Sequence, residues 1–130
     1  MNDNWKVSII TTTFNDAAHL RRIMEQVLRQ TYENIEYIVV DGASKDGTID
    51  LLKEMEPAFG GRLRWISEPD AGIYDAINKG VRLATGDLIG CCFDHFTGDD
   101  VIARMVDVIR REGTDGVHAD LVYKDGDKVI

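Results

Sequence analysis

Two kinds of hydrophobic pattern alternate along this chain. Some short runs are almost entirely apolar or β-branched, which is typical of strands that are buried on both faces. These runs cover residues 7–13, 35–40 and 88–92, and residues 63–67 are expected to form a further short strand. In the segments that follow them, apolar residues recur every three or four positions, which predicts helices with one buried side. These segments cover residues 17–30, 48–55 and 73–84, and a fourth begins near residue 99.

The order of these elements predicts an α/β fold with a mostly parallel sheet and helices on both faces. We expect the second helix to end before Pro57, because proline disrupts a helix interior. We expect the third helix to bury one face, formed by Ile73, Ile77, Val81 and Ala84. Near the end of the sequence, residues 118–123 are typical of a strand, 124–127 of a hairpin turn and 128–130 of a returning strand.

A carboxylate follows the second predicted strand directly. Asp41 ends this strand, and Gly42 allows a tight turn before Ser44 and Asp46, which are good helix N-cap residues. In open α/β sheets, ligands bind in the crevice at the carboxyl ends of the strands. Asp41 is therefore a candidate ligand-binding residue. A purely structural role, in which Asp41 caps the turn, is equally compatible with this stretch.

The charge of the chain limits its ligands. Its 130 residues carry 15 Lys and Arg against 23 Asp and Glu, a net charge of −8. This balance argues against nucleic-acid binding, which requires a basic face. A phosphate ligand would need local cations, a helix N-terminus or a metal ion. Asp94, which follows the fourth predicted strand, could meet Asp41 at one edge and hold Mg²⁺ or Mn²⁺ with substrate phosphates.

Several classes of protein are disfavoured by what the sequence lacks. There is no glycine between the first strand and the first helix, which excludes a dinucleotide fingerprint or a P-loop there. Cys91 and Cys92 are adjacent and point to opposite faces of a strand, which favours free thiols in a reducing compartment. No signal peptide and no membrane-spanning run is evident, so we expect a cytoplasmic protein. Contact with a membrane surface through a lipid substrate stays open.

Four segments, taken together, resemble glycosyltransferase family 2, which has the GT-A fold. They are VSIITTTFNDA (7–17), QTYENIEYIVVDGASKDGT (30–48), SEPDAGIYDAINKG (67–80) and ATGDLIG (84–90). The resemblance implies a Rossmann-like three-layer sandwich, with residues 1–130 as one donor-binding domain that is truncated after the donor-binding half. It also implies inverting transfer of a sugar from a nucleotide-diphospho-sugar, of the UDP type, to a glycan or a lipid-linked acceptor.

The same resemblance implies roles for individual residues. Thr11, Thr13 and Asp41 are expected to line a uridine pocket. The segment from Asp70 to Gly80 is expected to border the nucleotide and the sugar. Within that segment the implied donor-binding residues are Asp70, Asp75, Asn78 and Lys79.

The metal-binding motif of the family is altered here. The family carries an Asp-x-Asp type motif after the fourth strand, where this chain reads Cys-Cys-Phe-Asp-His at residues 91–95. Asp94 alone matches, and it is the expected ligand of Mn²⁺ or Mg²⁺ and a donor-binding residue. His95 is a second candidate ligand, a phosphate contact or a surface residue. We therefore expect a weakened or altered metal dependence.

The acceptor site and the catalytic base are not evident. In the family both lie in a C-terminal half, after the hairpin where this sequence stops, and no catalytic residue is predicted here. The chain is therefore expected to be a donor half, and a noncatalytic nucleotide-binding or assembly module is the alternative function. The strands at 118–123 and 128–130 would leave a sheet edge open, which suggests a homodimer through that edge.

Overall fold

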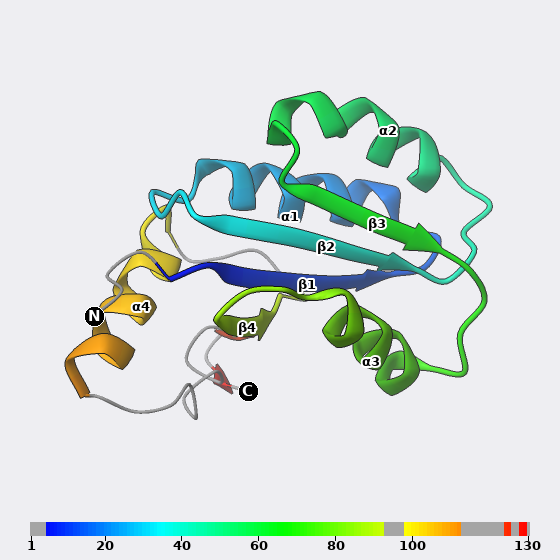
Figure 1. Cartoon of the computed structure of the whole chain (residues 1–130). Coiled ribbons are helices and arrows are strands. Elements are labelled where there is room, and N and C mark those ends of the chain that lie inside the picture. Colours follow the sequence, from blue (N-terminus) through cyan, green and yellow to red (C-terminus); the bar gives the residue numbers. More distant parts are fainter. Residues whose placement is uncertain (1–4, 93–97, 113–123, 126–127, 130) are drawn as a thin grey trace.

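The computed structural model describes residues 5–92, 98–112, 124–125 and 128–129 (Figure 1). Four parallel strands form one sheet in the order β3-β2-β1-β4. Their bounds are Val7–Thr13 for β1, Ile35–Asp41 for β2, Leu63–Ser67 for β3 and Leu88–Cys91 for β4. The helices are α1 (Ala17–Arg29), α2 (Thr48–Phe59), α3 (Ile73–Leu83) and α4 (Val101–Glu112). The predicted α/β fold with a parallel sheet is confirmed.

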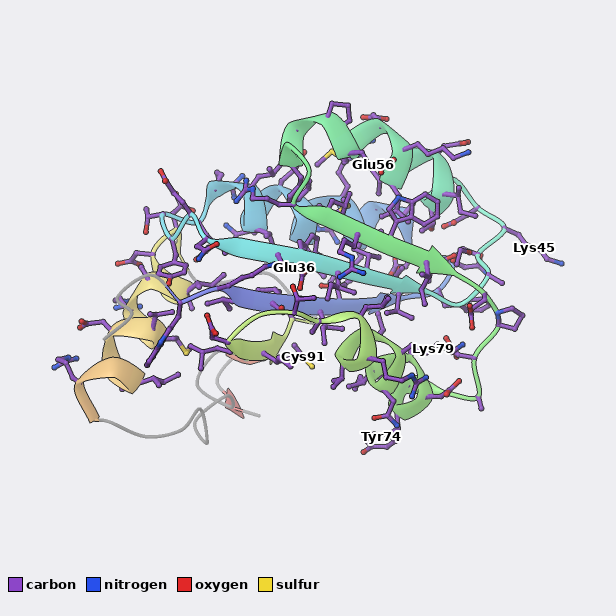
Figure 2. All side chains as sticks on the ribbon, viewed as in Figure 1. Glu36, Lys45, Glu56, Tyr74, Lys79 and Cys91 are labelled. Carbon is purple, nitrogen blue, oxygen red and sulfur yellow. The ribbon has the colours of Figure 1, made fainter. Side chains whose placement is uncertain are left out.

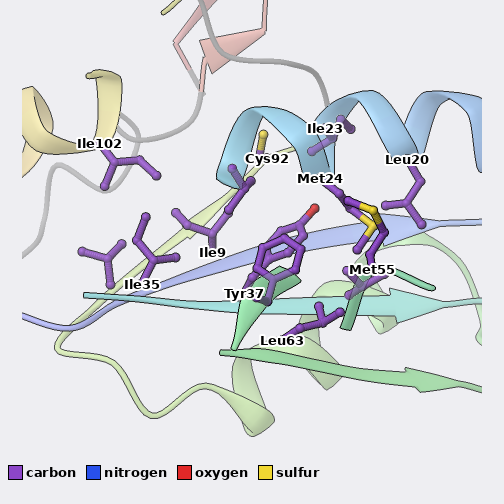
Figure 3. Packing of buried hydrophobic residues seen from close by; sticks show 14 of the residues in the cluster. Ile9, Leu20, Ile23, Met24, Ile35, Tyr37, Met55, Leu63, Cys92 and Ile102 are labelled. Atoms are coloured by element: carbon purple, nitrogen blue, oxygen red, sulfur yellow. The ribbon is translucent and has the colours of Figure 1, made fainter. Parts of the chain in front are cut away.

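Alternation along the central strands sends side chains into two separate cores. Ile9 and Tyr37 point toward α1 and α2, while Ile10 and Ile38 point toward α3 on the opposite face of the sheet. The larger core also contains Val101, Ile102, Val106 and Ile109 of α4. Figure 3 shows the part of this core around Tyr37, whose ring stacks on that of Phe59 with 5.5 Å between their centroids. Helices on both faces therefore cover the sheet, as the sequence predicts (Figure 1).

The second helix extends beyond its predicted end. It continues through Pro57 to Phe59, and Gly60 ends it in the left-handed conformation, with φ of 57°. Phe59 is 2% exposed, so the last turn is held in place by the burial of its ring. Pro57 lies in that last turn, where one lost backbone hydrogen bond disrupts little of the helix.

The buried face of α3 is not the one that the sequence predicts. Ile73 and Val81 are 52% and 43% exposed, whereas Ala76 and Gly80 are buried against the sheet. An added Cβ on Gly80 would lie 2.6 Å from Cγ2 of Ile10 in β1. Ala84 does pack against the core around Ile10, as predicted. The prediction was wrong for Ile73 and Val81 because α3 approaches the sheet through its smallest residues, while the hydrophobic pattern emphasises large ones.

Two strands of two residues each are described near the end of the sequence. β5 (Lys124–Asp125) pairs with β6 (Lys128–Val129) in antiparallel fashion. The predicted returning strand is thus present at Lys128–Val129, whereas Lys124 and Asp125 belong to a strand rather than to the predicted turn. The predicted strand at 118–123 lies outside the described residues, so the homodimer through that edge stays a prediction.

Candidate functional site

The carboxyl ends of three strands are aligned in one row. The register pairs Thr13 with Asp41 and Asp41 with Ser67, so these residues end β1, β2 and β3 side by side. The chain moves outward from β1 to β3 and returns to the other side of β1 with β4. The strand order therefore reverses between β1 and β4. Open α/β sheets bind ligands at the carboxyl edge of the strands, beside such a reversal. The loops that follow the three strands therefore form the candidate site.

Asp41 is the organising residue of this edge. Its carboxylate is fully buried and accepts hydrogen bonds from the backbone and the hydroxyl of Ser44, at 2.9 and 2.5 Å. It also accepts a bond of 2.7 Å from the hydroxyl of Ser67 on the neighbouring strand. The turn-capping role that the sequence left open is thus present in the structure. The expected contact with a base stays a prediction.

The two predicted threonines have different surroundings. Thr11 is 1% exposed, and its hydroxyl donates to the carbonyl of Cys92 at 2.7 Å while it accepts from the hydroxyl of Tyr37 at 2.8 Å. It therefore joins β1 to the residue that follows β4, inside the core. Thr13 is half-buried at the edge, and its carbonyl accepts from the backbone of Gly42 at 3.0 Å.

Side chains connect the loops that follow β1 and β2. The side chain of Asn15 accepts from the backbone of Lys45, and the backbone of Asn15 donates to the hydroxyl of Ser44, both at 2.7 Å. The carboxylate of Asp46 accepts from the backbone of Ala17 at 3.1 Å and of Thr48 at 3.0 Å. One carboxylate thus satisfies amide groups at the start of both α1 and α2, which fixes the two loops relative to each other.

Phe14 is a candidate functional residue that the sequence analysis missed. It is 63% exposed in the loop after β1, an unusual position for a phenylalanine. A Cβ atom on Gly42 would lie 3.4 Å from Cδ1 of Phe14 and 3.0 Å from Oδ2 of Asp70. An open aromatic ring beside a carboxylate provides a surface on which a nucleobase can stack. An aromatic residue directly after a buried strand was the available signal for this role.

The remaining predicted residues belong to the β3–α3 loop and to α3. Asp70 accepts a hydrogen bond from the backbone of Gly72 at 3.2 Å, and Asp75 accepts one from Ala71 at 2.9 Å. The latter bond lowers the pKa of Asp75 below its ordinary value. Asn78 is exposed on α3. Lys79 donates to the carbonyl of Pro69 at 2.9 Å, so its ammonium group points into the loop.

The expected metal ligands Asp94 and His95 lie outside the described residues, as does the expected meeting of Asp94 with Asp41. Within the part of the chain that the structure describes, no group of three or more His, Cys, Asp or Glu side chains could hold a metal ion. No helix in that part is long and apolar enough to cross a membrane.

Comparison with known proteins identifies the family. The profile of Glycosyl transferase family 2 matches residues 8–129. The chain belongs to this family. It is 43% identical over 110 residues to an uncharacterized glycosyltransferase of Mycobacterium tuberculosis, a match that covers 82% of this chain and 41% of that protein. It is 38% identical over 120 residues to a PGL/p-HBAD biosynthesis glycosyltransferase of Mycobacterium bovis, with coverage of 90% and 47%. The chain thus spans less than half the length of these curated relatives.

Solved glycosyltransferases share its fold. The mannosyltransferase PcManGT from Pyrobaculum calidifontis, in complex with GDP-Man and Mn²⁺, superimposes with a TM-score of 0.72 at 26% identity. That match covers 81% of this chain and 32% of PcManGT. TarS of S. aureus, in complex with UDP-GlcNAc, gives a TM-score of 0.76 at 17% identity, with coverage of 85% and 32%. The GT-A fold and membership of a glycosyltransferase family are therefore established for this chain.

Proposed function

We propose that this chain binds a nucleotide-diphospho-sugar of the UDP type at the carboxyl edge of its sheet. In the longer glycosyltransferase that its relatives represent, the sugar would pass with inversion to a glycan or a lipid-linked acceptor. The observation that supports this most strongly is the meeting of Phe14, Gly42 and Asp70 beside the buried Asp41. The complex of PcManGT with GDP-Man adds support, because it is a related protein with a donor of the same chemical class.

We assign the base to the part of the edge next to β1 and β2. The ring of Phe14 would stack on the base, and Asp41 and Thr13 would border it. Thr11 is buried and would support this pocket indirectly, through its hydrogen bond to the carbonyl of Cys92. Asp41 would contact the base only by giving up one of its bonds to Ser44 or Ser67, since its carboxylate is fully buried.

We assign the sugar and the diphosphate to the side of the edge next to α3 and the end of β4. Asp70, Asp75 and Asn78 would border the sugar. Asp94, with His95 as a second ligand, would hold Mn²⁺ or Mg²⁺ together with diphosphate oxygens. Such an ion neutralises the charge of a leaving diphosphate, which an acidic chain cannot do alone. We assign no general base in this chain.

The proposal places the protein in the cytoplasm. Neither Cys91 nor Cys92 belongs to a disulfide, which suits a reducing compartment. A lipid-linked acceptor would bring the protein to a membrane surface as a peripheral partner. Its net charge of −8 gives no basis for a nucleic-acid partner.

Variants at Phe14 test the base site. We expect Phe14→Leu to weaken UDP binding by about fivefold to 150-fold, because stacking on a base contributes about 1–3 kcal/mol. Phe14→Tyr keeps the ring and should bind UDP like the unchanged protein, which makes it the matched control. Equal affinities for the Leu and Tyr variants, measured by calorimetry, would contradict this site.

Turnover separates the enzyme from the alternative, a noncatalytic nucleotide-binding or assembly module. Release of UDP from UDP-sugars in the presence of Mn²⁺, with and without glycan acceptors, is the relevant assay. Detectable turnover excludes the module as a full account. UDP binding without turnover by a full-length relative would favour the module.

A further inference from the structure

The ammonium group of Lys79 binds oxygen atoms of the loop that precedes its own helix. It is 12% exposed, and its ammonium nitrogen lies 3.0 Å from a carboxylate oxygen of Glu68 and 3.6 Å from one of Asp75. The same nitrogen donates to the carbonyl of Pro69 at 2.9 Å. A lysine has three N–H donors, and three protein oxygens surround this one. Lys79 belongs to the second half of α3, and its long side chain reaches back to the loop that arrives from β3 (Figure 2).

The loop between β3 and α3 is anchored at its start by the backbone of Glu68, which donates to the carbonyl of Asp41 at 3.0 Å. Gly72 takes a φ of 121°, which lets the chain reverse before α3 begins. The backbone of Ala71 is held by Asp75, and that of Gly72 by Asp70. Lys79 is the group that joins the first half of the loop, Glu68 and Pro69, to the body of α3.

The electrostatic surroundings of Lys79 keep it charged and occupied. The hydrogen bond to Glu68 raises the pKa of Lys79, and the nearby carboxylates of Asp75 and Asp70 raise it further. The charge of Lys79 in turn contributes to the lowered pKa of Asp75, after the larger effect of the Ala71 backbone. Because three carboxylates lie near this one ammonium group, the net charge of the cluster is negative, and the cluster attracts a phosphate only weakly.

The position of this loop decides where Asp70 lies. Oδ2 of Asp70 stands 3.0 Å from the point where a Cβ of Gly42 would be, so the carboxylate rests against the end of β2. If the loop moved away from α3, Asp70 would leave this position, and the edge beside Phe14 would widen.

We propose that Lys79 is a positioning residue, which holds the β3–α3 loop on α3 and thereby sets Asp70 at the donor site without touching the donor. This inference rests on the proposed function for the identity of the ligand. It replaces the expectation from the sequence that the ammonium group of Lys79 contacts the nucleotide or the sugar.

Affinities for UMP and UDP distinguish positioning from contact. We expect Lys79→Met to weaken the binding of both nucleotides by the same factor, about fivefold, because the shape of the edge changes for both. Lys79→Arg, which keeps the charge and can reach the same oxygens, should restore most of the affinity. The matched control is Lys53→Ala on the exposed side of α2, with unchanged affinity. A loss for UDP that clearly exceeds the loss for UMP would show a phosphate contact and overturn the proposal.

A double-mutant cycle tests whether Lys79 acts through Asp70. If it does, the pair of substitutions Lys79→Met and Asp70→Asn should weaken UDP binding no more than Asp70→Asn alone. Additive losses would overturn the proposal. Melting temperatures show whether each variant is folded at the temperature of the titration.

Hydrogen exchange tests the loop without any ligand. The amide groups of Ala71 and Gly72 should exchange faster in Lys79→Met than in the unchanged protein, and those of β2 should not. Unchanged exchange at both residues would overturn the proposal even if UDP binding falls. If the unchanged protein binds neither nucleotide, the proposed function fails, while faster exchange in the variant still supports the role of Lys79 in the loop.

Discussion

Oδ2 of Asp70 lies 3.0 Å from the position that a Cβ atom of Gly42 would take. These two residues belong to different loops, one after β2 and one after β3. The absence of a side chain on Gly42 lets the carboxylate rest directly against the end of the sheet. The contact therefore joins two loops of the candidate site through the smallest residue available.

The first prediction concerns this contact. Gly42→Ala should displace Asp70 by a few tenths of an ångström and weaken UDP binding by about threefold to tenfold, at a stability cost of about 1 kcal/mol or less. Gly47→Ala in the same loop is the matched control, because its Cβ would meet nothing within 4 Å. Calorimetric titration with UDP and urea unfolding measure the two effects. Equal affinities for the two variants would contradict a role of this contact in the site.

The sequence predicts the strands far better than the site, and the reason is physical. β1 begins and ends where its apolar run does, because a strand that is buried on both faces leaves an uninterrupted pattern. The meeting of Gly42 with Asp70 leaves no such pattern. It depends on the strand order and on the reversal at Gly72, whose φ is 121°. Both are properties of the folded chain as a whole.

Asp41 shows the same limit at a single residue. Its place at the end of a strand follows from the sequence, which left open whether its carboxylate caps the turn. The hydrogen bond from Ser67 requires β2 and β3 to be neighbours in register, which the sequence does not specify. Burial of the carboxylate follows from that pairing, and the sequence pattern gave no sign of it.

A second prediction concerns a buried carboxylate at the opposite, amino end of the sheet. Glu36 accepts hydrogen bonds from Ser8 at 2.8 Å, from the backbone of Thr85 at 2.9 Å and from Arg64 at 3.2 Å. Burial raises the pKa of Glu36, but these hydrogen bonds outweigh it and lower the pKa from 4.5 to about 2. They anchor the turn before β4 to β1 and β2, which sets where β4 begins.

Because the pKa of Glu36 is lower in the folded chain than in the unfolded chain, the ionised form stabilises the fold. This stabilisation is complete above about pH 4.5 and is lost as the pH falls toward 2. The shift corresponds to about 3 kcal/mol. We expect Glu36→Gln to lower stability at pH 7 by about 2–3 kcal/mol and to flatten the decline between pH 5 and 3, as measured by urea unfolding. The exposed Glu56→Gln is the control, and a decline as steep in Glu36→Gln as in the control would be inconsistent with this account.

A third prediction concerns the close approach of α3 to the sheet. In Gly80→Ala, the new Cβ would lie 2.6 Å from Cγ2 of Ile10, closer than atoms can pack. We expect a loss of about 1–3 kcal/mol in the free energy of unfolding, although alanine favours a helix over glycine by about 1 kcal/mol. Adding Ile10→Ala removes the clashing atoms, so the double variant should be more stable than the sum of the single effects predicts. Additive effects in urea unfolding would show that α3 does not pack through Gly80.

We propose that the carboxyl edge of this sheet binds a metal-bridged nucleoside diphosphate. Calorimetric titration of the chain with UDP, with and without Mn²⁺, tests this claim most directly. We expect saturable binding of one UDP that Mn²⁺ strengthens, with the gain from Mn²⁺ lost in Asp94→Ala. Absence of UDP binding under both conditions, or a gain from Mn²⁺ that is the same in Asp94→Ala, would contradict it.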